Sequence, residues 1–447
     1  MQSFSARVLR TQAKQVGPIG RSSGVRVLVA RSGSSSTSSV HGSAVQDATI
    51  ELELRKSAHN YHPIPVVLTR AKGVHMWDQD GNKYIDFLAA YSAVNQGHCH
   101  PRIVKVLKEQ AEVLTLTSRA FHSDQMGVYA DFITKLFGYD KVLPMNTGVE
   151  AGETAVKLAR KWAYLVKGVP ENKAKVVFAR NNFWGRTLAA ISSSTDPSSY
   201  AGYGPFMPGF ELVDYNDLAL LEKSISDPNT AAFMVEPIQG EAGVKVPDDG
   251  YLSGIRRLCD KHRVLWIADE VQTGLCRTGK MLACDHENVK PDILCLGKAL
   301  SGGTMPVSAV LCNDEVMLTI KPGEHGSTYG GNPLACRVAV ESLRVLVDEH
   351  LAENAERQGQ RLRSELRALK SPIIQEVRGK GLLNAVVIDD RSSDGSYAWD
   401  VCMRLAKLGL LAKPTHGNII RFAPPLTVND KEMEESLDIL SRGLQPL

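Results

Sequence analysis

Short apolar runs that alternate with helical stretches constrain the fold of this chain more than any other feature. Each run is too short for a helix and apolar enough for a buried parallel strand. The runs cover Val176–Ala179, Ala231–Val235, Val264–Ala268 and Ile293–Leu296, and helical patterns lie at Asp217–Ser226 and Tyr251–His262. This order predicts an α/β fold whose parallel or mostly parallel sheet is covered by helices on both faces.

Two polar residues follow the last two runs. Asp269 comes directly after Val264–Ala268, and Lys298 comes after Ile293–Leu296 and Gly297. In open α/β sheets, ligands bind outside the carboxyl ends of the strands. A lysine for a Schiff base and an acid for a ring nitrogen are what pyridoxal 5'-phosphate needs, so this cofactor is predicted. The alternative is that Lys298 is an ordinary solvated lysine.

Other cofactor motifs fit less well. Gly297-Lys298 resembles the end of a phosphate-binding loop, but Asp292 stands where its first glycine is required, and Ala299 where its hydroxyl is required. The sheet pattern alone would permit a nicotinamide-dependent dehydrogenase, but no G-x-G-x-x-G follows an early strand. A catalytically silent fold that acts as a binding protein is a third alternative, against which Lys298 and Asp269 both argue.

The first 46 residues have the composition of a mitochondrial transit peptide. They contain no Asp or Glu, many serines, and six basic residues between Arg7 and Arg31. The alternative is a disordered tail with no targeting role. Without this segment the formal net charge changes from +3 to −3, so nothing favours a nucleic-acid partner. No run approaches the roughly 20 apolar residues of a membrane span, so no membrane partner is predicted.

The rest of the chain divides into three predicted parts. Residues 47–98 contain short runs and turns typical of an antiparallel meander, which we expect to pack with the smaller domain. Residues 99–335 form the large, cofactor-binding domain. Residues 336–447 form a smaller α+β domain, which a long helical stretch from 334 to about 369 opens. In it we expect strands at 373–377, 382–388 and 419–422, a turn at 379–381, and helices at 398–408 and 430–440.

His98-Cys99-His100 contains possible metal ligands. Because the three residues are adjacent and precede Pro101, a turn that opens a helix over Ile103–Leu114 explains them better, and no metal is predicted. The eight cysteines form no CxxC pair, so we expect reduced thiols.

A helix start offers a place for an anion. Thr147 and Glu150 have the spacing of a capping box, and the pattern that follows is helical as far as Val166. The backbone N–H groups of Gly148 and Val149 would then be available to a phosphate. The alternative is an ordinary capped helix that binds nothing.

Several motifs occur in a characteristic order: AHNYHP, YSAVNQGHCHP, LPMNTGVEAGETA, NFWGRT, VEPIQGEAG, IADEVQTG, LGKALSGG, GEHGSTYGGNP and LAKPTHGNIIRFAPPL. With them the chain resembles the class III pyridoxal-phosphate aminotransferases of fold type I, from about Ala58 to the C-terminus. IADEVQTG with a lysine 29 residues after its Asp marks the family. NFWGRT, YSAVNQGHCHP and IIRFAPPL narrow the resemblance to members that use ornithine. Members that use N-acetylornithine or 4-aminobutyrate share the Lys, Asp and Gln positions and stay alternatives.

The resemblance implies how the cofactor is held. Lys298 would bind it covalently and then act as a general base, and Asp269 would keep its ring nitrogen protonated. Phe183 would stack on the ring, and Gln272 would donate to its phenolic oxygen. Without the resemblance, Phe183 would be a core side chain and Gln272 a solvated surface residue.

The resemblance also implies that the site is shared. The cofactor phosphate would lie on Gly148 and Val149, and Thr328 of a second copy would reach it. One copy alone would lack part of the site, so a homodimer or larger assembly is expected.

Charged groups would select the substrates. Arg186 would grip a substrate carboxylate, and Tyr61 and Tyr91 would hold the α-groups of ornithine. Glu241 would neutralise Arg421 while ornithine reacts, and would release it for the second carboxylate of 2-oxoglutarate. Without the resemblance, Glu241 and Arg421 would be read as a structural ion pair.

The expected activity follows from these roles. The δ-amino group of L-ornithine would pass to the cofactor and then to 2-oxoglutarate by ping-pong kinetics. The products would be glutamate 5-semialdehyde, which cyclises to pyrroline-5-carboxylate, and glutamate. The transit segment implies that the reaction takes place in the mitochondrial matrix.

Overall fold

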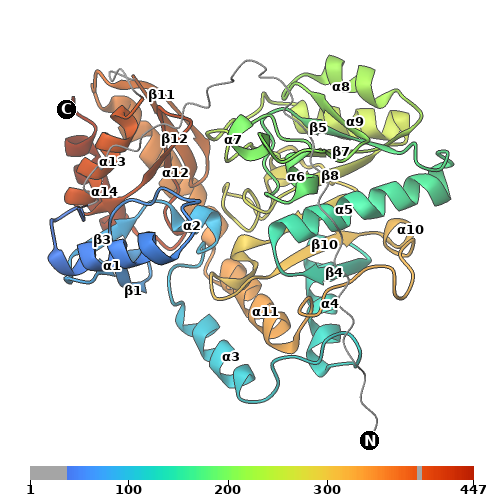
Figure 1. Cartoon of the computed structure of the whole chain (residues 1–447), viewed down its shortest axis with the longest axis horizontal. Coiled ribbons are helices and arrows are strands. Elements are labelled where there is room, and N and C mark those ends of the chain that lie inside the picture. The colour runs from blue at the N-terminus through green and yellow to red at the C-terminus, as the bar shows by residue number, and fades with distance from the viewer. Residues whose placement is uncertain (1–37, 390–394, 447) are drawn as a thin grey trace, which may run out of the picture. The chain divides into compact units, whose positions relative to one another are not determined.

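A seven-stranded sheet with the strand order β4-β10-β9-β8-β7-β5-β6 is the central element of the fold (Figure 1). The structure, a computed structural model, describes residues 38–389 and 395–446. The strands are β4 (Lys141–Met145), β5 (Lys175–Ala179), β6 (Phe210–Val213), β7 (Thr230–Val235), β8 (Leu265–Asp269), β9 (Ile293–Leu296) and β10 (Ser308–Cys312). Only the two pairs that involve β10, with β4 and with β9, are antiparallel. The predicted α/β fold with a mostly parallel sheet is confirmed.

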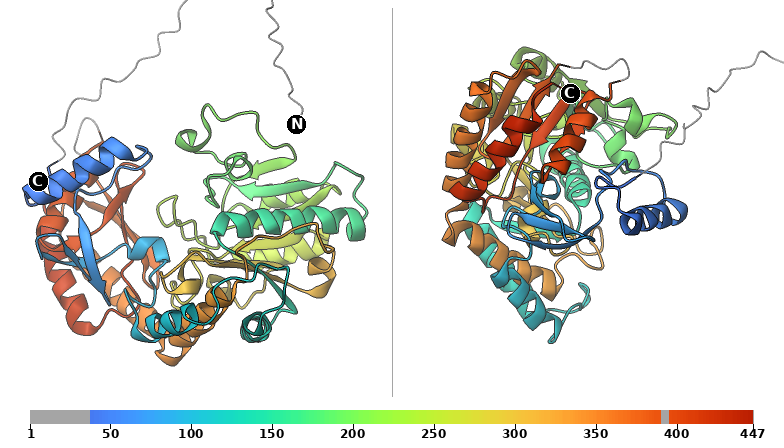
Figure 2. Two further views of the ribbon diagram at one scale, coloured as in Figure 1. Left: turned by 60° about the horizontal axis from the view of Figure 1, so that its bottom comes forward. Right: turned by 90° about the vertical axis from the view of Figure 1, so that its left-hand side faces the viewer.

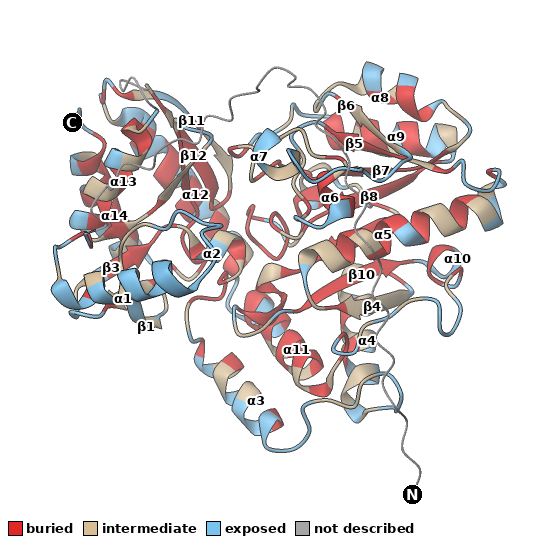
Figure 3. Ribbon diagram, in the orientation of Figure 1, coloured by how far each residue is buried: buried red, intermediate tan, exposed pale blue. Residues whose placement is uncertain are grey.

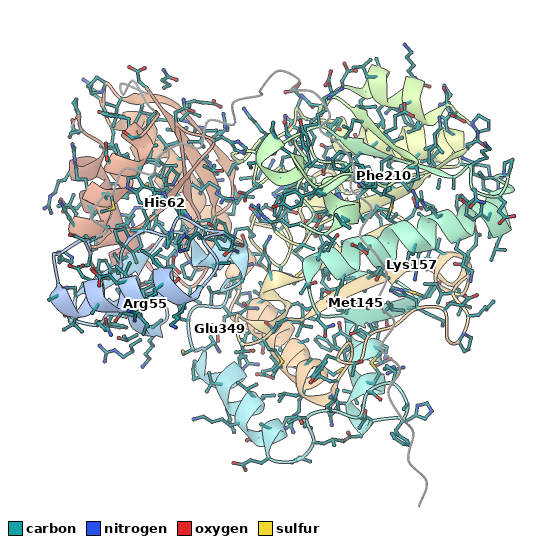
Figure 4. The ribbon with its side chains drawn as sticks, viewed as in Figure 1. Arg55, His62, Met145, Lys157, Phe210 and Glu349 are labelled. Carbon is teal, nitrogen blue, oxygen red and sulfur yellow. The ribbon has the colours of Figure 1, made fainter. Side chains whose placement is uncertain are left out.

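Helices cover both faces of this sheet. Along β5 the side chains alternate: Val176 and Phe178 belong to the core beneath α5 (Gly148–Trp162), and Val177 and Ala179 to the core on the opposite face. That opposite core includes residues of α8 (Leu218–Ile225) and α9 (Tyr251–His262). The strands are accordingly among the most buried parts of the molecule (Figure 3). At the edge of the sheet, the ring of Phe210 packs on Phe178 with centroids 4.7 Å apart (Figure 4).

Most predicted elements of the sheet region are present with small shifts. β9 and α9 have the predicted bounds, and α8 is capped by Asp217 and Ser226 at the ends of the predicted range. Three strands, β4, β6 and β10, were not predicted. The helix expected at Ile103–Leu114 is α3 (Pro101–Ala111), preceded by the predicted turn. There His98 lies 2.7 Å from Asp86 and His100 lies 3.0 Å from Glu349.

The segment before the sheet contains the predicted antiparallel meander. Helix α1 (Ala44–Lys56) begins inside the range expected for the transit segment, whose first 37 residues lie outside the described residues. Strands β1 (Leu68–Lys72), β2 (His75–Asp78) and β3 (Lys83–Asp86) pair antiparallel. Strand β13 (Leu410–Leu411) joins β3 in parallel. The His62 ring stacks on Trp399 of helix α13 (Tyr397–Lys407), with ring centroids 4.1 Å apart, so this segment packs against the C-terminal part of the chain (Figure 4).

A four-stranded sheet with the order β11-β12-β15-β14 forms the C-terminal part (Figure 2). Its strands are β11 (Ile374–Lys380), β12 (Leu383–Ile388), β14 (Lys413–Thr415) and β15 (Ile419–Phe422). Helices α13 (Tyr397–Lys407) and α14 (Asp430–Gly443) match the predicted ones. The expected turn at 379–381 is shorter, because β11 continues to Lys380.

The prediction of one long helical stretch after residue 334 is wrong. The structure has two helices, α11 (Pro333–Asp348) and α12 (Leu351–Ala368). His350 between them has a φ of 53°, in the left-handed region, which ends a right-handed helix.

The remaining elements are short, except α4. They are α2 (Ala89–Ser92), α4 (Asp124–Phe137), the π-helix η1 (Ala163–Lys167), α6 (Leu188–Ile191), α7 (Pro197–Tyr200), η2 (Ala283–Glu287), η3 (Lys298–Ser301) and α10 (Asp314–Met317). Within the described ranges, no helix is both long enough and apolar enough for a membrane crossing. Residues Ser38–Leu447 form one unit, and the borders predicted near residues 98 and 335 stay predictions.

Candidate active site

Three charged side chains follow neighbouring strands at one edge of the seven-stranded sheet. Asp269 ends β8, Lys298 follows β9 after Gly297, and Glu236 follows β7. The negative charges of Asp269 and Glu236 both stabilise the charged form of Lys298. The structure thus brings together the acid and the lysine on which the cofactor prediction depends, at the carboxyl ends of parallel strands.

Asp269 is almost fully shielded from water, with 6% of its surface exposed. Its Oδ1 accepts a hydrogen bond from the Val271 N–H at 3.1 Å. Burial raises the pKa of the carboxyl group to about 6, while the Val271 N–H and Lys298 act in the opposite direction. A buried carboxylate with so few partners is suited to hold a cation, because an opposite charge favours its ionised form.

Lys298 begins η3 with a φ of 45°, in the left-handed region. Burial lowers the pKa of its amine, and Asp269 and Glu236 act against this shift. A lower pKa increases the fraction of neutral amine, the form that attacks a carbonyl carbon and accepts a proton. Backbone strain of this kind clusters at functional sites.

The start of α5 opens on the same pocket as Lys298. Thr147 caps the helix, and the predicted capping box with Glu150 is present: the Thr147 N–H donates to the Glu150 carboxylate at 2.7 Å. The N–H groups of Gly148 and Val149 have no partner among the described residues. A pocket of about 400 Å³ lies in front of this helix start. Its lining includes Thr147, Gly148, Lys298, Ser301, Gly303 and Thr304.

Gln272 follows Asp269 on the same loop and is buried. No described residue forms a hydrogen bond with its side-chain amide. A Cβ atom at Gly240 would collide with Gln272 Oε1, so only glycine leaves room for this side chain. The amide has no protein partner and is therefore available to a ligand.

Glu236, which was not predicted as a site residue, is hydrogen-bonded to the backbone of Phe183. The Phe183 N–H donates to Glu236 Oε1 at 2.9 Å, and the Gly240 N–H donates to Glu236 Oε2 at 3.4 Å. Burial, and secondarily the charge of Asp269, raise the pKa of Glu236 to about 8. Glu236 follows the run Ala231–Val235 directly, so the strand-end argument used for Asp269 was sufficient to find it.

Arg421 and Glu241 form an ion pair in which Arg421 Nη1 donates to Glu241 Oε2 at 2.9 Å. The Arg421 side chain is 5% exposed, and that of Glu241 is 32% exposed. The Arg421 guanidinium lies over the ring of Tyr91, 4.6 Å from its centroid. Burial raises the pKa of Tyr91, and Arg421 partly offsets this rise. Three predicted site residues from distant parts of the sequence therefore meet.

Tyr61 and Arg186 line a second pocket of about 430 Å³. Both residues are exposed, and the Arg186 side chain forms no ion pair with a described acidic residue. Its guanidinium lies 5.6 Å from the ring centroid of Phe183. An unpaired guanidinium beside the ring of Phe183 is available to a carboxylate.

Within the described part of the chain, Thr328 forms no hydrogen bond with any of the other predicted site residues. It lies in an exposed loop, where its neighbour Ser327 accepts a hydrogen bond from Asn146 Nδ2 at 2.8 Å. No described residue forms a hydrogen bond with the Thr328 side chain.

Pyridoxal phosphate fits these residues. The unpartnered N–H groups of Gly148 and Val149 suit its phosphate, and the unpartnered amide of Gln272 suits its phenolic oxygen. The buried Asp269 carboxylate suits a protonated ring nitrogen, and Lys298 has the amine that binds the aldehyde.

The raised pKa of Asp269 predicts that the cofactor-free protein binds the cofactor less tightly in acid. The carboxyl group is ionised only above about 6, and its ionised form is the one that holds a protonated ring nitrogen. Fluorescence titrations at a series of pH values should show the dissociation constant rising as the pH falls through about 6. In Asp269→Asn the part of the pH dependence that comes from the Asp269 carboxyl group should be absent, so only the titration of the cofactor itself should affect the dissociation constant. Equal pH dependence in both proteins would contradict the assignment.

The chain matches known proteins over nearly its whole length. The profile of the family described as Aminotransferase class-III matches residues 56–444. The mitochondrial ornithine aminotransferase of Drosophila melanogaster is 66% identical over 392 residues, which cover 88% of this chain and 90% of that protein.

Two solved structures share the fold. An ornithine aminotransferase from Toxoplasma gondii, with pyridoxal phosphate partly occupying its active site, is 53% identical with a TM-score of 0.88. The match covers 89% of this chain and 94% of that one. An acetylornithine aminotransferase from Elizabethkingia anophelis is 55% identical with a TM-score of 0.82, and covers 89% and 98% of the two chains. This protein is a member of the class III aminotransferase family, and pyridoxal phosphate is its cofactor.

Proposed function

We propose that this chain catalyses the ornithine aminotransferase reaction. The δ-amino group of L-ornithine passes to 2-oxoglutarate, which yields glutamate 5-semialdehyde and glutamate by ping-pong kinetics. The semialdehyde cyclises to pyrroline-5-carboxylate. The observation that supports this choice best is the buried Arg421, paired with Glu241 and lying over Tyr91, because such a group can treat two unlike substrates differently.

The bound cofactor supplies an electron sink for the charge that develops at the substrate carbon. Asp269 would keep the ring nitrogen protonated, and Gln272 and Phe183 would hold the ring. The Lys298 amine would hold the cofactor and, when free, would move the proton of the substrate carbon that bears the reacting nitrogen.

Ornithine binds through its α-groups, with the carboxylate on Arg186 and with Tyr61 and Tyr91 beside it. Its δ-amine then points at the cofactor. During this half-reaction Glu241 neutralises Arg421, so that the pocket does not attract a second carboxylate. When 2-oxoglutarate binds, Glu241 releases Arg421 to its distal carboxylate.

A second copy of the chain completes the site. In this proposal Thr328 of one copy reaches the phosphate held by Gly148 and Val149 of the other. Its exposed position on a loop beside Asn146 supports this, because such a side chain is free to meet another molecule. We also propose that residues 1–46 direct the protein to the mitochondrial matrix, as their acid-free composition and the mitochondrial fly relative suggest.

The test of the proposed function uses the cofactor-loaded protein with ornithine alone. Without an amino acceptor, the protein should form one equivalent of pyrroline-5-carboxylate, and its cofactor should convert to the amine form. Adding 2-oxoglutarate should restore the original spectrum. Initial rates on N-acetylornithine and 4-aminobutyrate should be much lower than on ornithine. A higher rate on N-acetylornithine would overturn the choice of substrate while leaving the aminotransferase reaction intact.

We expect Glu241→Ala to shift the reaction from the δ-amine toward α-amines. Without the carboxylate, Arg421 stays charged and unpaired during the first half-reaction and attracts a distal carboxylate. The rate of amino transfer from glutamate, relative to ornithine, should rise about tenfold, which corresponds to ~1.4 kcal/mol. Stopped-flow conversion of the cofactor by each amino acid measures this ratio.

Glu222→Ala is a matched control, since Glu222 pairs with Lys261 on the surface. It should leave the ratio unchanged. An unchanged ratio in Glu241→Ala as well would mean that Glu241 and Arg421 form a purely structural pair.

A further inference from the structure

Arg277 is a fully buried cation without an acidic partner. None of its surface is exposed, and no described acidic residue forms an ion pair with it. Burial lowers the pKa of its guanidinium to about 9, and only Asp86 stabilises the charge from a distance. Burying a charge among neutral groups is costly, so this arginine needs a compensating role.

The guanidinium joins three segments that are distant in the sequence. Nε and Nη2 donate to Asn95 Oδ1 at 3.2 Å and 2.6 Å. Nη1 donates to the carbonyl oxygens of Leu382 at 2.9 Å and Pro424 at 2.7 Å. Asn95 Nδ2 in turn donates to the Leu275 carbonyl at 2.8 Å. The guanidinium therefore cross-links these segments, in addition to the backbone hydrogen bonds from the Leu426 N–H to Asn95 O and from the Ala423 N–H to Phe87 O, both at 2.8 Å.

One of these segments carries Tyr91. Ala89, Ala90, Tyr91 and Ser92 form α2, and all four have positive φ values between 46° and 74°. A left-handed turn of four residues without glycine costs roughly 1–2 kcal/mol per residue. On its amino side, Asp86 Oδ1 accepts hydrogen bonds from the N–H groups of Leu88 and Ala89. On its carboxyl side, the next side chain tied to another segment is Asn95, which Arg277 holds.

Another segment carries Arg421. Pro424, whose carbonyl oxygen accepts a hydrogen bond from Arg277, lies three residues after Arg421 and just beyond the end of β15. The neighbouring strand β12 begins next to Leu382, and its Ala385 pairs with Arg421. Arg277 itself lies five residues after Gln272 on the loop that leaves Asp269. The hydrogen bonds from Arg277 to Asn95, Leu382 and Pro424 therefore all go to segments that flank the Tyr91–Arg421 contact.

We propose that Arg277 is a positioning residue that holds the strained turn of Tyr91 against the strand of Arg421, and so sets the pocket for the distal carboxylate. It touches neither substrate nor cofactor. Its effect on catalysis passes through the position of Arg421, which must be free to meet the second carboxylate of 2-oxoglutarate. The proposal rests on the role of Arg421 in the proposed function.

The test compares two amino acceptors in Arg277→Gln. Glutamine removes the unpaired charge, which limits the loss of stability, but its single amide cannot reach Asn95, Leu382 and Pro424 together. 2-Oxoglutarate needs Arg421, whereas pyruvate has no distal carboxylate. Relative to wild type, kcat/KM for 2-oxoglutarate should fall about tenfold, mostly through KM, while that for pyruvate stays within about twofold. Asn95→Ala, which keeps Arg277 but removes its acceptor, should show the same selective loss and serves if Arg277→Gln does not fold.

Arg363→Gln is the matched control. Arg363 is also buried and donates to neutral acceptors, Gly381 O at 2.7 Å and Asn384 Oδ1 at 2.8 Å, but contacts neither Asn95 nor Pro424. It should lower the melting temperature and leave the ratio of the two acceptors unchanged. An equal fall for both acceptors in Arg277→Gln and Asn95→Ala, or no fall, would overturn the positioning role.

Measurements on the wild-type protein distinguish a failure of the Arg277 proposal from a failure of the role proposed for Arg421. If the wild type does not prefer 2-oxoglutarate to pyruvate, Arg421 does not bind a distal carboxylate, and both proposals fall. If the wild type has this preference and the variants keep it, only the role of Arg277 is refuted.

Discussion

Lys298→Ala should fold and take up pyridoxal phosphate, but transfer amino groups roughly 10⁴-fold more slowly than the wild type. This is the upper end of what positioned proton transfer contributes, and in the proposed function Lys298 would also be the covalent attachment point. Among the described residues that line the pocket at the start of α5, Lys298 is the one lysine. Single-turnover conversion of ornithine measures the loss.

Added small amines sharpen the test of Lys298. If its amine moves the proton, methylamine should restore part of the rate in Lys298→Ala, and stronger bases should restore more. Lys290→Ala is the control, because Lys290 lies over the ring of Tyr139, in another part of the molecule, with its nitrogen 4.1 Å from the ring centroid. A Lys298→Ala protein that turned over at more than about a tenth of the wild-type rate would rule out this general base.

Asp269→Asn should lower kcat by about 10²- to 10³-fold, the range for one electrostatic group at a reacting centre. Asparagine keeps an acceptor for the Val271 N–H but cannot hold the ring nitrogen protonated. Steady-state rates at saturating ornithine and cofactor measure the effect. Glu211→Gln is a control that should retain full activity, because Glu211 is a half-buried carboxylate that pairs with Lys175.

Although Asp269→Asn should lose activity, the cofactor-free variant should not lose stability. The rise in the Asp269 pKa from 3.8 to about 6 corresponds to roughly 3 kcal/mol against the ionised form. The folded state then binds more protons than the unfolded state between these values, so wild-type stability falls as the pH rises through this window. Above it, Asp269→Asn should melt no earlier than the wild type. A variant that lost both activity and stability would indicate a structural role instead.

The sequence was sufficient for the parallel strands that are buried on both faces, but not for the antiparallel β10, which is equally buried. β7, β8 and β9 are continuous apolar runs, and the order of runs and helices predicted a mostly parallel sheet. β4 was missed because Pro144 interrupts it, and β6 because only Val213 of its four residues is fully buried. The break between α11 and α12 falls at Glu349-His350, which contains neither glycine nor proline and so gave no signal.

Positions in the candidate site could be predicted where one residue stands at a strand end or in a family motif, and their roles stay predictions. Asp269, Lys298 and the capping box at Thr147 are of this kind. Arg277 could not be found this way, because its partner Asn95 lies 182 residues away and no periodicity marks either residue. Nor could the sequence show that Tyr91 lies over Arg421, since this contact requires the C-terminal strands to pack beside the left-handed turn.

The left-handed turn also has a consequence for how this region tolerates change. Ala90 is exposed, so any side chain has room there, and a library of substitutions would ordinarily be permissive at such a surface position. However, its φ of 46° lies in the left-handed region, which glycine, asparagine and aspartate adopt readily and the β-branched residues valine, isoleucine and threonine do not. Ala90 should therefore be as selective as a core residue, for a reason that lies in the backbone and not in packing.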